Sequence, residues 1–210
     1  MKSVIRMLMF FLLLFTGCNR DEPLIPLCNP EKYFPLKIGN YWIYRYYKVY
    51  LDGGTGNEFT DSMYISSDTL MLGYRFFHLQ GTFHSKPISY YLTSADGQVV
   101  SAEGYVFYEC PRLIESTKQY PIMGFDFPGT INTTRFDAPV KVPAGDFDPV
   151  MLFEAHSMLN DTIWIVTYKA YYAKNVGIVK FSAKPEPDSN FESFSELIRY
   201  RVDNQRATGI

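Results

Sequence analysis

The sequence has no apolar run long enough to cross a bilayer. Its longest run, Met7 to Phe15, holds nine residues. As a helix such a run would rise only about 14 Å, against a hydrocarbon core of about 30 Å. The sequence therefore predicts no transmembrane helix.

Positive charge is not in excess either. The chain carries 20 Lys and Arg against 22 Asp and Glu, for a net charge of −2 over 210 residues. A nucleic-acid partner calls for a basic stripe that can meet phosphates, and none is visible. Low-complexity segments and repeats are also absent, so we expect a single folded domain and no nucleic-acid partner.

Motifs for catalysis or cofactor binding are missing as well. There is no G-x-S-x-G elbow, HExxH pair, phosphate-binding loop or dinucleotide fingerprint. Glu154 and His156 share strand parity, as do His78 and His84, but Gly81 can break the second alternation and solvated histidines are common. We predict no catalytic residues, no metal site and no cofactor, and hence a protein that is not an enzyme.

The amino terminus has the order of a secretion signal. Lys2 and Arg6 precede the apolar run, and the small residues Thr16 and Gly17 follow it before Cys18. A basic start, a short apolar run and small residues at a cleavage point are typical of an exported chain. Residues 1–17 are therefore predicted to be a signal peptide.

The residues around the cleavage point resemble the lipobox of bacterial lipoproteins. In that motif a small residue precedes a cysteine that becomes the lipidated first residue, and here Phe15 departs from the preferred Leu. The resemblance implies lipidation of Cys18, palmitate included, and attachment to the membrane through the lipid. The alternative is a plain secretory signal with an incidental cysteine.

The stretch after Cys18 reads as a tether. Residues 18–30 are polar or interrupted by proline, and residues 31–210 form the predicted β-rich domain. Asn19 to Glu22 resembles the short acidic export tag of Bacteroidetes-type lipoproteins, although any hydrophilic tether would look similar. We expect an outer membrane lipoprotein on the periplasmic face or the cell surface.

Two further cysteines, Cys28 and Cys110, are left once Cys18 carries lipid. An exported chain folds in an oxidising compartment where thiols tend to pair. The sequence leaves two alternatives open, a Cys28 to Cys110 disulfide or two buried free thiols, because it cannot supply the separation of the two Cα atoms.

Aromatic residues are abundant, with 17 Phe, 17 Tyr and 2 Trp. They lie in short runs with Val, Ile and Thr, bounded by Gly, Pro, Asn and Asp, which is typical of strands and turns. Connections are too short for helical crossovers, so neighbouring strands should pair antiparallel. The predicted fold class is all-β: one antiparallel, strongly twisted or curved sheet, a half-barrel or a sandwich, of roughly ten or more strands. The predicted strands are 41–51, 62–72, 74–83, 88–93, 98–102, 105–110, 129–136, 150–158, 162–172, 177–183 and 193–202.

The first predicted strand, 41–51, is aromatic on both faces. Trp42, Tyr44 and Tyr46 share one face, and Tyr41 and Tyr47 lie on the other. Either both faces are covered, or one of them lines a cavity or presents a stacking surface. On the second alternative Trp42, Tyr44 and Tyr46 are the candidate ligand-binding residues.

Three segments resemble a family of exported bacterial proteins of unknown function, many of them lipoproteins of the Bacteroidetes type. They are YFPLKIGNYWIY at Tyr33 to Tyr44, VPAGDF at Val142 to Phe147 and YYAKNVGIVKF at Tyr171 to Phe181. Each has a structural explanation, namely a stiffened entry, a hairpin tip and the start of a strand. The resemblance implies an antiparallel β domain, curved like the half-barrel of lipoprotein carriers, and brings no catalytic residues.

Two modification sites are predicted from a third resemblance. Asp61-Ser62-Met63 and Asp161-Thr162-Ile163 are similar to the acceptor motif of Bacteroidetes-type O-glycosylation, as is Asp68-Thr69-Leu70 inside a predicted strand. Asp followed by Ser or Thr is also ordinary turn chemistry. We predict O-linked glycan on Ser62 and Thr162.

Two functions outside catalysis fit these observations. The first is a binding module of the cell envelope that holds an apolar ligand or a glycan on an aromatic surface. The second is an interaction or scaffold lipoprotein that presents an exposed apolar patch to an envelope protein in an outer-membrane complex.

Overall fold

Antiparallel strands make up almost all of the computed structural model, which describes residues 29–56, 58–110, 118–121, 128–159, 163–185 and 190–203. The signal peptide, Cys18, Cys28 and Thr162 lie outside these residues. The elements in chain order are η1 (Pro30–Lys32), β1 (Tyr41–Tyr50), β2 (Phe59–Met71), β3 (Tyr74–Phe83), β4 (Lys86–Ala95), β5 (Gln98–Ser101), β6 (Val106–Glu109), β7 (Lys118–Pro121), β8 (Pro128–Asp137), β9 (Val140–Val142), β10 (Gly145–Phe147), β11 (Val150–Leu159), β12 (Ile163–Ala173), β13 (Gly177–Pro185) and β14 (Phe191–Arg201).

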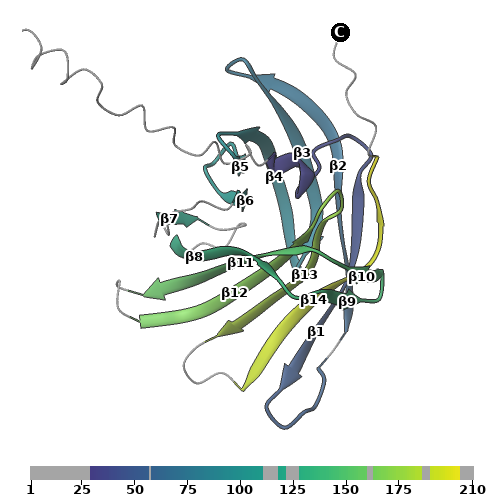
Figure 1. Ribbon diagram of the computed structural model, residues 1–210, viewed down its shortest axis with the longest axis vertical. Coiled ribbons are helices and arrows are strands. Elements are labelled where there is room, and N and C mark those ends of the chain that lie inside the picture. The colour runs from purple at the N-terminus through teal and green to yellow at the C-terminus, as the bar shows by residue number, and fades with distance from the viewer. Residues whose placement is uncertain are drawn as a thin grey trace, which may run out of the picture.

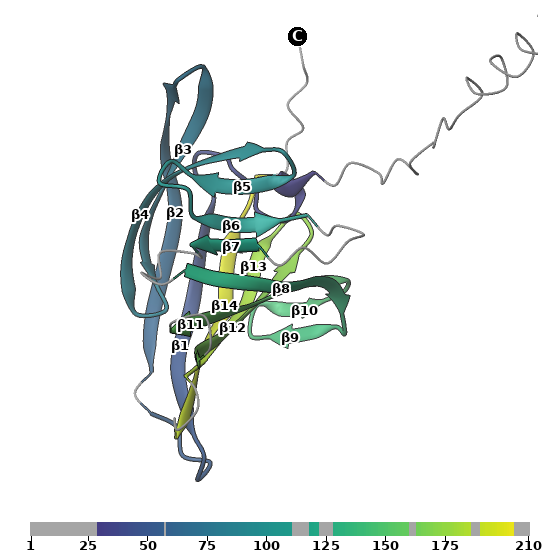
Figure 2. The same cartoon turned by 90° about the vertical axis from the view of Figure 1, so that its left-hand side faces the viewer.

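Within the described residues, twelve strands form one sheet in the order β6-β5-β4-β3-β2-β1-β14-β13-β12-β11-β8-β7, and β9 and β10 form a separate hairpin. The sheet curves until β6 and β7, at its two edges, come close to each other, as both views show (Figure 1, Figure 2). The result is a barrel-like shape whose concave side encloses the core. The prediction of an all-β, antiparallel, curved sheet is confirmed.

Most predicted strands are confirmed within a few residues, and the predicted strand 74–83 coincides with β3. Three short strands, β7, β9 and β10, were not predicted. β9 and β10 hold only three residues each, and β7 has a single residue that favours strands, Tyr120. The hairpin tip predicted from Val142 to Gly145 is confirmed, since β9 and β10 pair on either side of Pro143 and Ala144.

Aromatic side chains fill the concave side of the sheet. Their polar atoms bond to main-chain oxygens: Trp42 Nε1 donates to Val176 O at 2.5 Å, and Tyr44 Oη donates to Ile178 O at 3.0 Å. Tyr172 Oη donates to Phe107 O and so links β12 to the edge strand β6 across the core. These bonds satisfy the buried polar groups and hold the two halves of the curved sheet together.

The segments that carry the family resemblance meet in this core. Phe34 and Trp42 pack ring against ring with centroids 5.9 Å apart. Gly177, at φ +107°, lies so close to the indole that an added Cβ would be 3.1 Å from Trp42 Nε1. Ala144, at the tip of the β9 to β10 hairpin, donates its N–H to Leu197 O in β14 at 2.9 Å. The motif residues thus act as determinants of the fold.

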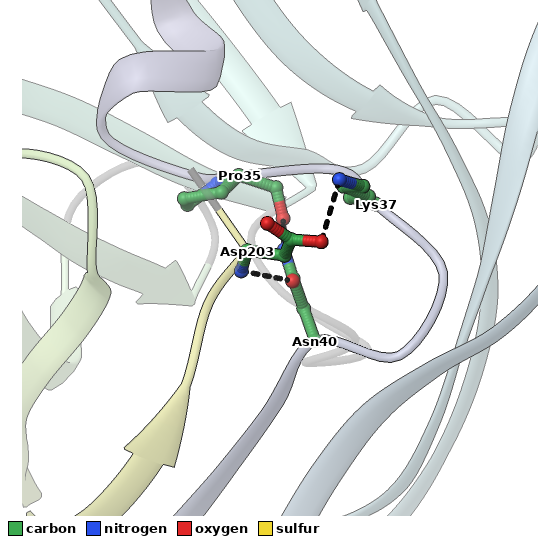
Figure 3. A network of polar contacts seen from close by, with 4 residues as sticks. All are labelled: Pro35, Lys37, Asn40 and Asp203. Carbon is green, nitrogen blue, oxygen red and sulfur yellow. Dashed lines mark hydrogen bonds and ion pairs between the residues drawn. The ribbon is translucent and has the colours of Figure 1, made fainter. Parts of the chain in front are cut away.

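A polar network fastens the entry of the chain to its exit (Figure 3). The fully buried Asn40 donates from Nδ2 to Pro35 O and accepts the Asp203 N–H at Oδ1, both at 3.0 Å. Lys37 Nζ lies 2.8 Å from Asp203 Oδ2. The segment before β1 is therefore held against the segment after β14.

Cys110 follows β6, is almost fully buried and is disulfide-bonded. Its predicted partner, Cys28, lies outside the described residues, so the pairing stays a prediction. Within the described ranges, no helix has the length and apolar character needed to cross a membrane.

Candidate functional site

The candidate site lies on the convex, outer face of the sheet, where β1, β14 and β13 run side by side. In the register of these strands Arg45 is opposite Glu196, which is opposite Lys180. One row further on, Tyr47 is opposite Phe194. Residues directly opposite each other project from the same face of a sheet, so charged and aromatic side chains alternate along this surface.

These strands border a groove of about 360 Å³. It lies where β1 and β13 end and β14 begins, at the lower end of the molecule in Figure 1. The volume is within the range of known small-ligand pockets, about 300 to 1,000 Å³. The lining residues are Tyr47, Val49, Tyr50, Leu51, Lys180, Lys184, Phe191, Glu192 and Phe194.

Two aromatic pairs build the apolar part of the groove. The rings of Tyr47 and Phe194 stack with centroids 5.4 Å apart, and those of Tyr50 and Phe191 meet edge to face at 6.2 Å. Tyr50 is 37% exposed. The rings are therefore supported by one another and still reach the surface, as a stacking platform requires.

Cations lie over these rings. Lys48 Nζ is 4.4 Å from the centroid of Phe191, Lys180 Nζ is 5.3 Å from that of Phe194, and the Arg45 guanidinium carbon is 5.1 Å from that of Tyr47. Each distance is within the range of a cation–π contact.

One carboxylate, Glu196, organises the centre of the platform. Arg45 Nη2 donates to Oε2 at 2.9 Å and Lys180 Nζ lies 3.2 Å from Oε1. Burial by itself raises the pKa of Glu196, but the hydrogen bonds from Arg45 and Lys180 outweigh it and hold that pKa below its ordinary value. Burial, together with the nearby Glu196 charge, raises the pKa of Tyr47 to about 12. Glu196 is thus ionised and Tyr47 neutral near neutral pH.

The candidate ligand-binding residues Trp42, Tyr44 and Tyr46 point the other way. Their side chains share one face, as predicted, but it is the concave face, and they are 1%, 0% and 7% exposed. This face of β1 is therefore covered by the core and presents no stacking surface. The stacking surface lies on the opposite side of the same strand.

His84 is also part of the core. It lies in the turn between β3 and β4 at φ +52°, with Nδ1 3.0 Å from Ser195 Oγ and Nε2 2.8 Å from Ser193 Oγ. Burial first, and then the charges of Lys86 and Lys48, lower its pKa to about 3. His84 is therefore neutral, forms two hydrogen bonds with serine hydroxyls, and is buried in the core.

The other histidines are dispersed. His78 stacks on Tyr91 with centroids 4.6 Å apart, and His156 Nδ1 lies 2.9 Å from Thr167 Oγ1. In the part of the chain that the structure describes, no three His, Cys, Asp or Glu side chains are grouped so that they could hold a metal ion.

Ser62, a predicted glycan acceptor, is exposed on β2, within the strand and not at its start as the sequence suggested. The preceding Asp61 is buried and accepts the Ser85 N–H at 2.8 Å. Glycosylation of Ser62 and of Thr162 stays a prediction.

The sequence pattern does not identify the groove residues Phe191, Phe194, Lys180 and Lys184. A signal was available, because the odd positions of β1, among them Arg45 and Tyr47, alternate with the buried aromatics and mix charge with aromatic character. The sequence does not show that β13 and β14, which begin at least 127 positions after the end of β1, supply the other side chains of the groove.

No protein-family model matches this sequence, and a search of curated proteins finds no match. Among solved structures, a predicted exported protein with a YmcC-like fold from Bacteroides fragilis is similar, with a TM-score of 0.51 and 16% identity over 83% of this chain and 100% of that one. A predicted lipoprotein from Parabacteroides distasonis gives a TM-score of 0.49 and 13% identity over 83% and 99%. The first likeness shows that the fold recurs in another protein.

Proposed function

We propose that this chain is a lipid-anchored binding module of the cell envelope, and that it binds an oligosaccharide in the groove on the outer face of β1, β13 and β14. The observation that carries the proposal is the groove itself, in which aromatic rings are surrounded by charged side chains.

The mixture of side chains favours a glycan over an apolar ligand. The C–H face of a sugar ring packs on an aromatic ring while its hydroxyls need donors and acceptors, and the groove offers both. A purely apolar ligand would take water from these charged groups and return no hydrogen bonds, which is costly.

The charges in and beside the groove balance. Three cations, Arg45, Lys180 and Lys184, lie with three carboxylates, Glu58, Glu192 and Glu196. An ammonium such as that of Lys184 can donate to the hydroxyls of a neutral sugar and can pair with the carboxylate of a uronic acid, so both kinds of oligosaccharide are candidates.

Removing one ring of the groove should weaken glycan binding. Phe191→Ala deletes a ring that supports Tyr50, and we expect about a tenfold loss of affinity, about 1.4 kcal/mol. Lys184→Gln should weaken binding of uronic-acid oligosaccharides more than binding of neutral ones. Isothermal titration calorimetry with both kinds of oligosaccharide measures these effects.

Tyr64→Ala is the matched control, because Tyr64 is an exposed aromatic residue on the neighbouring strand β2 and does not line the groove. It should leave the affinity unchanged. The glycan assignment would be wrong if neither kind of oligosaccharide bound, or if Tyr64→Ala and Phe191→Ala had equal effects. Binding of Nile red in the groove, lost in Phe191→Ala, would indicate an apolar ligand instead.

The anchor has its own test. Cys18→Ala should leave the protein without lipid and release it from the membrane fraction, because the acyl chains provide the attachment and each buried CH₂ contributes about 0.8 kcal/mol. Cys28→Ala, the matched control, should stay in the membrane fraction. Mass spectrometry and fractionation of cells measure the result, and a Cys18→Ala protein that still carries acyl chains would refute the assignment.

A further inference from the structure

The turn between β2 and β3 is unusually apolar and exposed. Leu72 is 99% exposed, Leu70 76% and Tyr74 60%. Large apolar side chains are normally scattered singly over a surface, whereas these three gather on one turn of a long hairpin.

The backbone of this turn adds to the anomaly. Leu72 has φ +52° and Gly73 φ +83°. Two successive residues with positive φ are what a tight hairpin turn requires, and Asn or Asp is the usual choice at the first of them. A leucine here is strained and buries nothing within the domain, so its side chain is unexplained by the fold.

The position of the turn in the molecule indicates which surface it contacts. In both views the β2 to β3 turn projects from the upper end of the molecule, and the start of the described chain near η1 also lies in the upper part (Figure 1, Figure 2). The ends of β1 and β13 and the start of β14, whose residues line the groove, lie at the lower end of Figure 1. Ten residues, 19–28, separate Cys18 from Asn29, and they can span at most about 40 Å.

We propose that the β2 to β3 turn inserts Leu70, Leu72 and Tyr74 into the surface of the bilayer that holds the lipid anchor. This inference rests on the anchor of the proposed function. The lipid at Cys18 keeps the upper end of the domain beside the membrane, and the apolar tip of the hairpin is the part that can enter it. Tyr suits this position, since its ring is apolar and its hydroxyl stays in water.

A charged pair limits the depth of insertion. In the register of the hairpin Arg75 is opposite Leu70, at the base of the tip, and its Nε donates to Asp68 Oδ2. Charged groups are costly to move into hydrocarbon, so insertion stops at the row of Leu70 and Arg75, with Leu72 deepest and the turn at the interface. Held in this way, the domain directs its groove away from the membrane.

The test places a fluorophore at the tip. In lipidated protein bound to vesicles of phosphatidylethanolamine and phosphatidylglycerol, Leu72→Trp should emit at shorter wavelength than in detergent-free buffer without vesicles. Lipids brominated on the upper acyl chain should quench it severalfold more than Leu51→Trp. Leu51 is an exposed groove residue directly after β1, and that end of β1 lies opposite the β2 to β3 turn. The spectrum of the parent protein is subtracted from both.

A second variant separates the effect of the apolar side chain of Leu72 from that of the turn conformation. Leu72→Asn keeps a residue that accepts positive φ but removes the apolar side chain. With Tyr74→Trp as the reporter, the Leu72→Asn change should reduce quenching by brominated lipid at least twofold.

Equal quenching of Leu72→Trp and Leu51→Trp, or stronger quenching of Leu51→Trp, would overturn the proposal, and an apolar protein surface would become the better occupant. The same comparison on protein coupled through Cys18 to a maleimide lipid does not depend on native lipidation. If native Cys18 proves unmodified, the anchor fails, and this arm still decides whether the tip enters the bilayer.

Discussion

Acidification from pH 6.5 to about 3 is expected to lower the free energy of unfolding by about 4 to 5 kcal/mol through His84 alone. The folded protein keeps the imidazole neutral, because burial and the charges of Lys86 and Lys48 hold the pKa at about 3. In the unfolded chain the same group takes up a proton near pH 6.5. Between these values the unfolded state binds more protons, so stability falls as the pH falls.

The free energy of unfolding falls on acidification because the pKa of His84 is lower in the folded state than in the unfolded state. Its contribution is complete above about pH 6.5 and is lost progressively down to about pH 3. His84→Gln removes the titration, so the stability of the variant should depend less on pH across this window. Urea denaturation at several pH values measures both curves, and loss of the Glu196 interactions at low pH affects both alike.

A direct measurement on the parent follows the imidazole C–H signals by NMR. A His84 signal that titrates near pH 6.5 in the folded protein would contradict the prediction.

Substitution of Gly81 by alanine is expected to destabilise the protein by more than about 4 kcal/mol, or to prevent folding. Gly81 lies in β3 at φ +130°, and an added Cβ would stand 1.9 Å from Ser62 O and 3.3 Å from Met63 Cα in β2. These are main-chain atoms of a paired strand, which cannot rotate away as a side chain could. The two strands would have to separate where Met63 pairs with Gly81.

Gly73→Ala separates the strain of a positive φ from the clash with the neighbouring strand. Gly73 also has positive φ, +83°, but an added Cβ would meet nothing within 4 Å. It should cost only the strain of the left-handed conformation, about 1 to 2 kcal/mol. Urea midpoints followed by circular dichroism compare the two variants, and equal losses would show that the clash with β2 is relieved at no cost.

Much of the fold could be predicted because its signals are local. Alternation and bounding turn residues identify strands such as β3, and short connections require antiparallel pairing. The tip at Pro143 and Ala144 could be predicted for the same reason, since a hairpin turn is encoded by the residues within it. The lipobox resemblance likewise depends only on neighbouring residues, and it predicts the anchor at Cys18.

The candidate site could not be predicted in this way, because it depends on pairings between distant segments. Period-two alternation divides β1 into two faces, but with aromatics on both it does not say which face is enclosed. Arg45 and Glu196 are 151 positions apart in sequence and meet only because β14 closes against β1. Within β1 the register also shifts between Ile43 and Tyr44, a displacement that no local pattern indicates.

The sequence alone determined the strands, the turns and the predicted point of attachment, since each depends on neighbours along the chain. The curvature of the sheet alone decided that Trp42, Tyr44 and Tyr46 are enclosed and that Tyr47 and Phe194 form an outer groove, since strand pairing across the whole chain sets which side is concave.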